Sequence, residues 1–183
     1  MSVFAKLSAT WAVKRPALER GLRSGATPKQ LATFQKKLAL PLPKTFLAMY
    51  AWHDGARDEN EWFEGAYGWM RLAFVLSHKQ MVDLVRGDDG TWDRAWVPFL
   101  QENGSDTVCL DTRTGEIFEW FNSGGTARNR LAPTLDAWLA HHLAITEAAK
   151  SLVTDDQVYA AFNGASAKRI RKKLSPGYPE GKR

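Results

Sequence analysis

The 183-residue sequence contains a single cysteine, Cys109. A disulfide within the chain needs two cysteines and a thiolate metal cage needs more, so both are excluded. The four histidines, His53, His78, His141 and His142, show no HExxH or other spacing typical of metal ligands. We therefore expect no metal site and no cofactor.

Long apolar runs are also missing. No stretch approaches the roughly 18–20 apolar residues that a membrane span requires, and the first 20 residues lack the pattern of a secretory signal. The sequence therefore favours a cytoplasmic protein with no membrane partner. Since 44% of the 183 residues are hydrophobic, we expect one domain with a substantial core rather than two.

Signatures of catalysis are absent from the sequence. The chain has no Walker loop, no GxGxxG and no GxSxG. His53 and Asp54 are adjacent at a predicted helix end and should point in different directions, so Asp54 is poorly placed to orient His53 as a base. Cys109 lies between two apolar residues of a predicted strand, where a buried, unreactive thiol is the usual outcome. We expect no catalytic residue and no enzyme activity.

Charge is distributed unevenly along the chain. Residues 1–44 contain nine Lys and Arg and one acid, whereas residues 45–167 contain nine Lys and Arg and eighteen acids. Residues 168–183 contain seven Lys and Arg and one acid. The net charge of +5 alone would indicate a nucleic-acid partner, but the central part of the chain is acidic. An acidic body favours a basic protein as partner.

Helices are predicted for the N-terminal part of the chain. Apolar residues on one face indicate a first amphipathic helix, which Pro16 bends or restarts. Residues 27–30 have the features of a capping box with proline at the first helical position. A further helix is expected to begin after Pro43 and to stop at Gly55.

The next segments predict a loop, a strand and a helix. Residues 56–65 are largely polar and acidic and indicate an exposed loop. Residues 67–76 are rich in aromatic and aliphatic side chains and predict a strand, after which Ser77 caps a helix. The residues that we expect this helix to bury are Met81, Leu84 and Val85.

The strongest β signal is a hairpin of residues 106–111 and 116–121, whose turn requires the positive φ that Gly115 supplies. A short strand over residues 96–100 precedes it, and residues 122–129 predict a flexible connection. Further helices are expected after Thr134 and Thr154.

These elements predict a single α+β domain with N-terminal helices, a central mainly antiparallel sheet and C-terminal helices packed against it. We place this domain at residues 1–165. Residues 166–183 are expected to form a basic tail with few buried contacts.

Two stretches share an order of motifs with a known family. In the first, a helix starts at Leu42 and Pro43 and is followed by the turn His53-Asp54-Gly55. The second combines a Trp-x-Pro strand, a glycine and acid loop, a strand ending in Asp and a Thr-Gly turn, at Trp96, Pro98, Gly104, Asp106, Asp111, Thr114 and Gly115. Over residues 31–143 the chain thereby resembles the SUKH superfamily, and within it the Smi/Knr type.

Most of these motif residues are expected to be structural. Glycine and proline set helix ends and turns, and an aspartate in a turn accepts backbone hydrogen bonds. The residues to which we assign structural roles are Leu42, Pro43, Gly55, Trp96, Pro98, Asp111 and Gly115.

The resemblance implies a non-enzymatic protein-binding module. The family includes fungal cell-wall assembly regulators and bacterial immunity proteins, so the expected function is to block a toxin, often a nuclease. Acidic side chains would face a basic rim and aromatic residues would supply anchors. The candidates, chosen from charge and expected exposure, are Asp58, Glu59, Glu61, Trp62 and Glu64, followed by Asp88, Asp89, Glu102 and Asp106. For each acid, a solvated position without a partner is the alternative.

Two other functions stay open. A regulatory scaffold would use the same fold to organise several proteins. A nucleic-acid-binding protein would use the basic tail, although only Tyr178 offers a stacking ring there and a solubilising tail is the simpler interpretation. The basic residues concerned are Lys168, Arg169, Arg171, Lys172, Lys173, Lys182 and Arg183.

Overall fold

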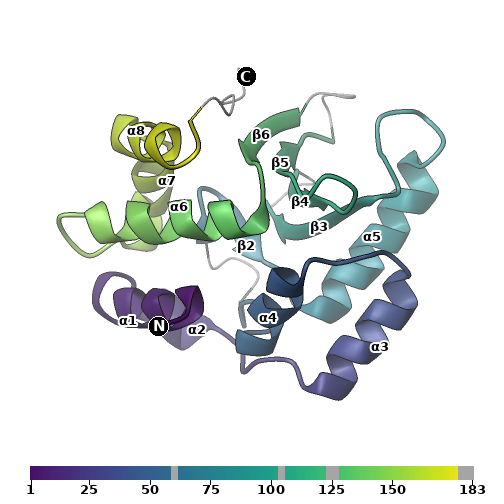
Figure 1. Ribbon diagram of the computed structural model, residues 1–183, viewed down its shortest axis with the longest axis horizontal. Coiled ribbons are helices and arrows are strands. Elements are labelled where there is room, and N and C mark those ends of the chain that lie inside the picture. The colour runs from purple at the N-terminus through teal and green to yellow at the C-terminus, as the bar shows by residue number, and fades with distance from the viewer. Residues whose placement is uncertain (59–61, 103–105, 123–127, 177–183) are drawn as a thin grey trace.

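The computed structural model describes residues 1–58, 62–102, 106–122 and 128–176. Over these residues the chain forms eight helices and one six-stranded antiparallel sheet in the order β1-β2-β3-β4-β5-β6, so every strand pairs with its neighbours in the sequence (Figure 1). The N-terminal helices and the C-terminal helices pack beside the sheet. The predicted single α+β domain is confirmed.

The N-terminal helices begin where the local sequence offers a start. Ser2 accepts the amide N–H of Ala5 at the first helix, and Pro16 occupies the first position of the second. The predicted capping box between Thr27 and Gln30 is present at the third. These helices are α1 (Val3–Lys14), α2 (Pro16–Gly21), α3 (Pro28–Leu38) and α4 (Lys44–Trp52).

The predicted hairpin forms the centre of the sheet. Its strands pair from Thr107 with Trp120 to Leu110 with Ile117, and Gly115 in the turn has a φ of +81°. The first and last strands of the sheet were not predicted. The strands are β1 (Trp62–Glu64), β2 (Tyr67–Trp69), β3 (Trp96–Gln101), β4 (Thr107–Asp111), β5 (Ile117–Trp120) and β6 (Arg128–Ala132).

The predicted strand over residues 67–76 is wrong beyond Trp69. A helix begins at Leu72 instead of after Ser77, because Asp54 Oδ1 accepts the amide N–H of Leu72 at 2.8 Å. The acceptor lies 18 residues earlier in the chain, so the local sequence does not indicate that a helix begins at Leu72. The remaining helices are α5 (Leu72–Arg86), α6 (Leu135–Ala148), α7 (Asp155–Asn163) and α8 (Ala165–Leu174).

The buried face of α5 also differs from the prediction. Met81, Leu84 and Val85 are exposed, whereas the buried residues are Leu72, Val75, His78, Lys79 and Val82. Lys79 is accommodated because its Nζ donates to Asp83 Oδ1 at 2.6 Å and to the carbonyl oxygen of Arg94 at 2.8 Å. A helix that buries a lysine and a histidine presents no clean apolar stripe, so the hydrophobic pattern indicated the wrong face.

Both faces of the sheet are packed. Successive side chains of a strand point to opposite faces, so Val97 and Leu110 lie in the main core while Trp96 and Cys109 lie in a second cluster. The main core also contains side chains of α1, α2, α4 and α6, such as Trp11 and Trp138. The other members of the second cluster are Val82, Trp92, Phe118 and Trp120.

The described part of the expected tail belongs to the fold. The boundary placed between residues 165 and 166 falls within α8, where Ala167 is buried in a cluster with Phe162. Arg171 Nη2 donates to Glu64 Oε1 at 3.0 Å, and Arg171 Nη1 donates to the carbonyl oxygen of Phe162 at 2.7 Å. The prediction of few buried contacts is therefore wrong for residues 166–176.

Glu64 connects β1 to the C-terminal helices from a buried position. Its Oε2 accepts the Nδ1–H of His142 at 3.2 Å, opposite the contact with Arg171. Burial disfavours the carboxylate, but the hydrogen bond from His142 and the charge of Arg171 hold the pKa of Glu64 below its ordinary value. Burial lowers the pKa of His142, so the ring is a neutral donor at pH 7.

Replacing Arg171 should destabilise the fold. An Arg171→Met variant leaves the buried Glu64 carboxylate without its cation, and the free energy of unfolding should fall by about 3 kcal/mol in urea titrations. Lys172→Met is the matched control, since Lys172 is exposed on the same helix and should change stability by less than about 0.5 kcal/mol. Equal stabilities of the two variants would contradict the structural role of α8.

Stability should fall on acidification. Because the folded-state pKa values of His142 and Glu64 are both lowered, their contributions are present above the ordinary values of 6.5 and 4.5 and are lost as pH falls below them. Urea midpoints measured from pH 7 to pH 3 should therefore decline. Glu64→Gln should be less stable at pH 7 and should show a shallower decline below pH 4.5. Parallel profiles for the two proteins would argue against a Glu64 contribution.

Candidate functional site

A surface groove with a volume of about 380 Å³ lies where the segments after α2 and α4 meet β2 and the start of α5. These elements come together beside α4 in Figure 1. Three of its lining residues are arginines, and the half-buried Phe74 contributes apolar wall, whereas Trp69 and Met70 are almost fully buried beneath it. We call it the arginine groove, with the polar lining residues Arg23, Arg57, Arg71, Gln101 and Glu102.

Backbone hydrogen bonds hold the first two arginines together. The amide N–H of Arg23 donates to the carbonyl oxygen of Gly55 at 2.9 Å, and that of Arg57 donates to Gly21 at 2.8 Å. Leu22 and Ala56 form an antiparallel bridge between these contacts. Arg57 Nε also donates to the carbonyl oxygen of Leu22 at 3.1 Å, which fixes the position of this guanidinium.

The turn His53-Asp54-Gly55 joins the Arg23 segment to the Arg71 segment. His53 Nδ1 donates to the carbonyl oxygen of Arg23 at 2.8 Å, while Asp54 accepts the amide N–H of Leu72. Gly55 has a φ of +73°, and a Cβ at this position would lie 2.6 Å from the backbone nitrogen of Arg71. Only glycine permits this approach, so the turn determines where the groove arginines lie.

The groove is also tied to the sheet. The amide N–H of Ala56 donates to the carbonyl oxygen of Trp69 at 2.9 Å, and that of Met70 donates to Phe99 at 3.1 Å. Tyr50 Oη donates to the carbonyl oxygen of Met70 at 2.9 Å, and burial raises the pKa of Tyr50, so its phenol stays protonated. The floor of the groove is therefore part of the rigid core.

The groove has an excess of positive charge. Among the described residues, no carboxylate lies within ion-pair distance of Arg23, Arg57 or Arg71. Glu102 lines the groove, and Asp54 lies behind it. Burial raises the pKa of Asp54, although the charges of Arg23 and Arg71 act in the opposite direction. Within the described residues, three guanidinium groups thus have two carboxylates near them.

The predicted acidic surface is reproduced only in part. Asp58 is exposed and follows the groove residue Arg57. Glu59 and Glu61 lie outside the described residues, as does the side chain of Trp62 in β1. Glu64 was expected to be exposed, but it is 8% exposed and bonded to His142 and Arg171. It is therefore unavailable to a partner.

Three of the remaining candidate acids contact neighbouring groups of the same chain, while Glu102 lines the arginine groove. Asp88 accepts from Arg94 Nη2 at 3.0 Å, and Asp89 accepts from Arg86 Nη1 at 3.2 Å. Asp106 Oδ1 accepts the amide N–H of Asn122 at 3.0 Å. Less negative charge is thus free on the surface than the composition indicates.

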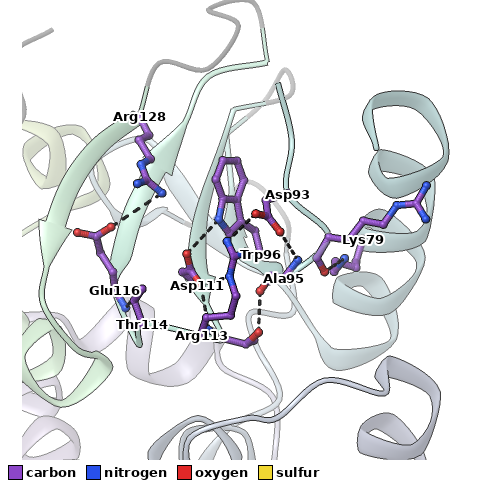
Figure 2. A network of polar contacts seen from close by, with 11 residues as sticks. Lys79, Asp93, Ala95, Trp96, Asp111, Arg113, Thr114, Glu116 and Arg128 are labelled. Atoms are coloured by element: carbon purple, nitrogen blue, oxygen red, sulfur yellow. Dashed lines mark hydrogen bonds and ion pairs between the residues drawn. The ribbon is translucent and has the colours of Figure 1, made fainter. Parts of the chain in front are cut away.

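The motif residues of the hairpin form a polar network at one end of the sheet, shown in Figure 2. Asp111 accepts Trp96 Nε1 at 3.3 Å and the amide N–H of Arg113 at 2.9 Å. Arg113 Nη2 pairs with Asp93 at 2.5 Å, and Asp93 accepts the amide N–H of Ala95. These contacts attach the loop before β3 to the hairpin turn.

The other motif residues lie in elements of the fold. Leu42 packs against the main core, and Pro43 immediately precedes α4. Pro98 pairs with Cys109 next to a bulge in β3. Gly104 lies outside the described residues.

The groups considered for catalysis do not converge. His53 and Asp54 bond to separate backbone segments. Cys109 is enclosed, and burial raises the pKa of its thiol to about 12, so no thiolate nucleophile is present at neutral pH. In the described ranges, no three His, Cys, Asp or Glu side chains are grouped so that they could hold a metal ion.

An antiparallel meander between helices, with its motif residues at the hairpin end and beside the arginine groove, defines a single α+β domain. A family model for the SMI1 / KNR4 family (SUKH-1) matches residues 25–141, and the chain belongs to this family. A comparison with curated proteins found no match. Arg57 and Arg71 lie within the matched region, and Arg23 lies two residues before it.

No helix in the part of the chain that the structure describes is long and apolar enough to cross a membrane.

The close approach at Gly55 can be tested against a second glycine. Gly55→Ala and Gly90→Ala both place alanine at a φ near +74°, which alone costs about 1 kcal/mol. A Cβ at Gly90 meets nothing within 4 Å, whereas at Gly55 it meets the backbone of Arg71 and Met70. Gly55→Ala should therefore lower the free energy of unfolding by at least about 2 kcal/mol more than Gly90→Ala. Equal losses in urea titrations would show that the approach is unimportant.

Proposed function

We propose that this chain is a protein-binding module without turnover of its own, and that it acts in the cytoplasm as an immunity protein. It binds a toxin, for example a nuclease, and blocks the surface with which the toxin acts on its substrate. The observation that carries this proposal is the match to the SUKH-1 family over residues 25–141. The arginine groove, built on a rigid floor, supports it by offering a preformed contact site.

The interface in this proposal combines the arginine groove with residues 58–62. Asp58, Glu59 and Glu61 provide a negatively charged rim for basic groups of the toxin, and Trp62 provides an aromatic anchor. Asp88, Asp89 and Asp106 contribute less, because their carboxylates already accept hydrogen bonds within the chain. Glu102 contributes a carboxylate to the proposed interface at the arginine groove, which it lines.

A scaffold of the cell-wall assembly regulator type is the alternative within the same family. The two roles differ in the number of partners. A pull-down with the tagged full chain should recover one toxin in a 1:1 complex if the immunity function holds. Several proteins of unrelated kind recovered together, with no toxin among them, would support the scaffold.

A nucleic-acid-binding function is favoured by one observation on α8. Lys168, Arg169, Lys172 and Lys173 are all exposed on this packed helix. Lys182 and Arg183 lie outside the described residues. Binding of an oligonucleotide at ~150 mM salt, lost when these four residues are replaced by glutamine, would support this function.

The immunity function is tested with the toxin encoded beside this gene. Purified full-length protein added to the toxin should abolish toxin activity at a 1:1 ratio and should itself leave esters, peptides, nucleotides and nucleic acids unchanged. Turnover that disappears in His53→Ala or Cys109→Ala would refute the binding-only assignment. An unaffected and unbound toxin would refute the immunity role.

The contribution of residues 58–62 separates into two kinetic effects. Reversing the charge of Asp58, Glu59 and Glu61 should slow toxin association and weaken its salt dependence, because steering is electrostatic. Trp62→Ala should mainly speed dissociation, with a loss of about 2 kcal/mol if the ring is an anchor. Glu147→Lys, an exposed reversal on α6, is the control. Melting temperatures measured in parallel identify losses that come from unfolding, and a stable Trp62→Ala protein with unchanged kinetics would remove this segment from the interface.

A further inference from the structure

We propose that the arginine groove binds an acidic segment of the partner protein, with a carboxylate of that segment held between Arg23 and Arg71. The inference rests on the proposed function, since it names the chemistry that the partner presents at the same site. It adds a basic contact to the expectation from composition, in which acidic side chains of this chain face a basic rim of the partner and aromatic residues supply anchors.

The first support is the convergence of three cations that have no carboxylate within ion-pair distance among the described residues. Arg23, Arg57 and Arg71 come from three segments and line one groove. Like charges that share a small volume repel, and no described carboxylate lies within ion-pair distance to offset the repulsion. An anion supplied from outside the chain would offset it.

The second support is that the backbone holds the arginines in place. The segments of Arg23 and Arg71 are joined through the turn at residues 53–55, and Arg57 Nε is bonded to Leu22. Because the supporting segments are fixed before binding, less conformational entropy is lost when an anion is bound. Guanidinium groups also match the planar geometry of a carboxylate, with two parallel N–H···O bonds.

The shape and lining of the groove favour a side chain over a nucleic-acid backbone. Its volume of about 380 Å³ accommodates one or two side chains, and the half-buried ring of Phe74 can pack against the methylene groups of a glutamate. A nucleic-acid strand carries phosphates at regular intervals and requires an extended basic track. Such a series of cations occurs on α8, whereas the groove cations surround one hollow.

The two nearby carboxylates do not cancel the positive charge. Asp54 accepts the amide N–H of Leu72, and Glu102 is half-buried and has no described arginine of the groove within ion-pair distance. With both ionised, the described residues of the groove still have an excess of one positive charge. In the proposed complex, the partner therefore presents an acidic side chain to the groove.

Peptide binding by the full chain tests the inference directly. Hexaglutamate should bind the wild-type protein in calorimetric titrations at ~50 mM salt, and hexaglutamine should not bind. Arg23→Gln and Arg71→Gln should each weaken hexaglutamate binding by at least about tenfold, since each removes charge-assisted hydrogen bonds. Arg71→Lys should give an intermediate loss of affinity, because lysine keeps the positive charge but cannot form two parallel hydrogen bonds with a carboxylate.

Arg20→Gln is the matched control. Arg20 is exposed at the end of α2, close to Arg23 in the chain, but it does not line the groove, so affinity should change by less than about twofold. The side chain of Arg71 is exposed, and its replacement should leave the melting temperature unchanged. If Arg23→Gln lowers the melting temperature, Arg71→Gln alone decides the test.

Three results would overturn the inference: no binding of hexaglutamate, an equal loss in Arg20→Gln, or tighter arginine-dependent binding of a single-stranded oligonucleotide than of the peptide. Other results distinguish a failure of this inference from a failure of the proposed function. Toxin binding that Arg71→Gln leaves intact and that hexaglutamate does not inhibit would refute the groove assignment and keep the immunity role. Arg71-dependent binding of hexaglutamate without any toxin binding would support the groove assignment and refute the immunity role.

Discussion

The close approach of three backbone segments at Gly55 is the constraint on which the rest of this structure depends. The segment after α2, the turn after α4 and the start of α5 meet there, and only a residue without a Cβ fits between them. The contact determines that α5 begins at Leu72, because Asp54 accepts a hydrogen bond from the amide N–H of this residue. It also brings Arg23 and Arg71 to the same groove. One turn thus positions both a core helix and the candidate site.

Several charged side chains of this chain stabilise the fold and are therefore not available to bind a partner. Glu64 joins β1 to α6 and α8 through His142 and Arg171, and Asp111 holds the hairpin turn through Trp96. These acids count toward an acidic composition but are absent from the surface. The charge that stays unpaired in the described residues is mainly basic, in the arginine groove and on α8. The free charge in the described residues therefore differs from the charge that the composition indicates.

The sequence correctly predicted those elements whose formation depends on residues close together in the chain. The capping box at Thr27, the proline restart at Pro16 and the hairpin turn at Gly115 each act within a few residues, and all three are present. The helix start at Leu72 was missed because it depends on a carboxylate 18 residues away. The orientation of α5 was missed because buried Lys79 satisfies its charge through Asp83 and a backbone carbonyl, which no hydrophobic pattern reveals.

By itself the sequence determined the α+β class, most helix boundaries, the central hairpin and the family, because caps, turns and ordered motifs are short-range features. Tertiary structure alone decided which charges are free. Arginines at positions 23, 57 and 71 carry no shared local pattern, and they become neighbours only through backbone hydrogen bonds between distant segments. The same holds for Glu64 and Arg171, which are 107 residues apart and become partners when α8 packs against the domain. Pairing between distant residues requires the folded chain, and the candidate site is composed of such residues.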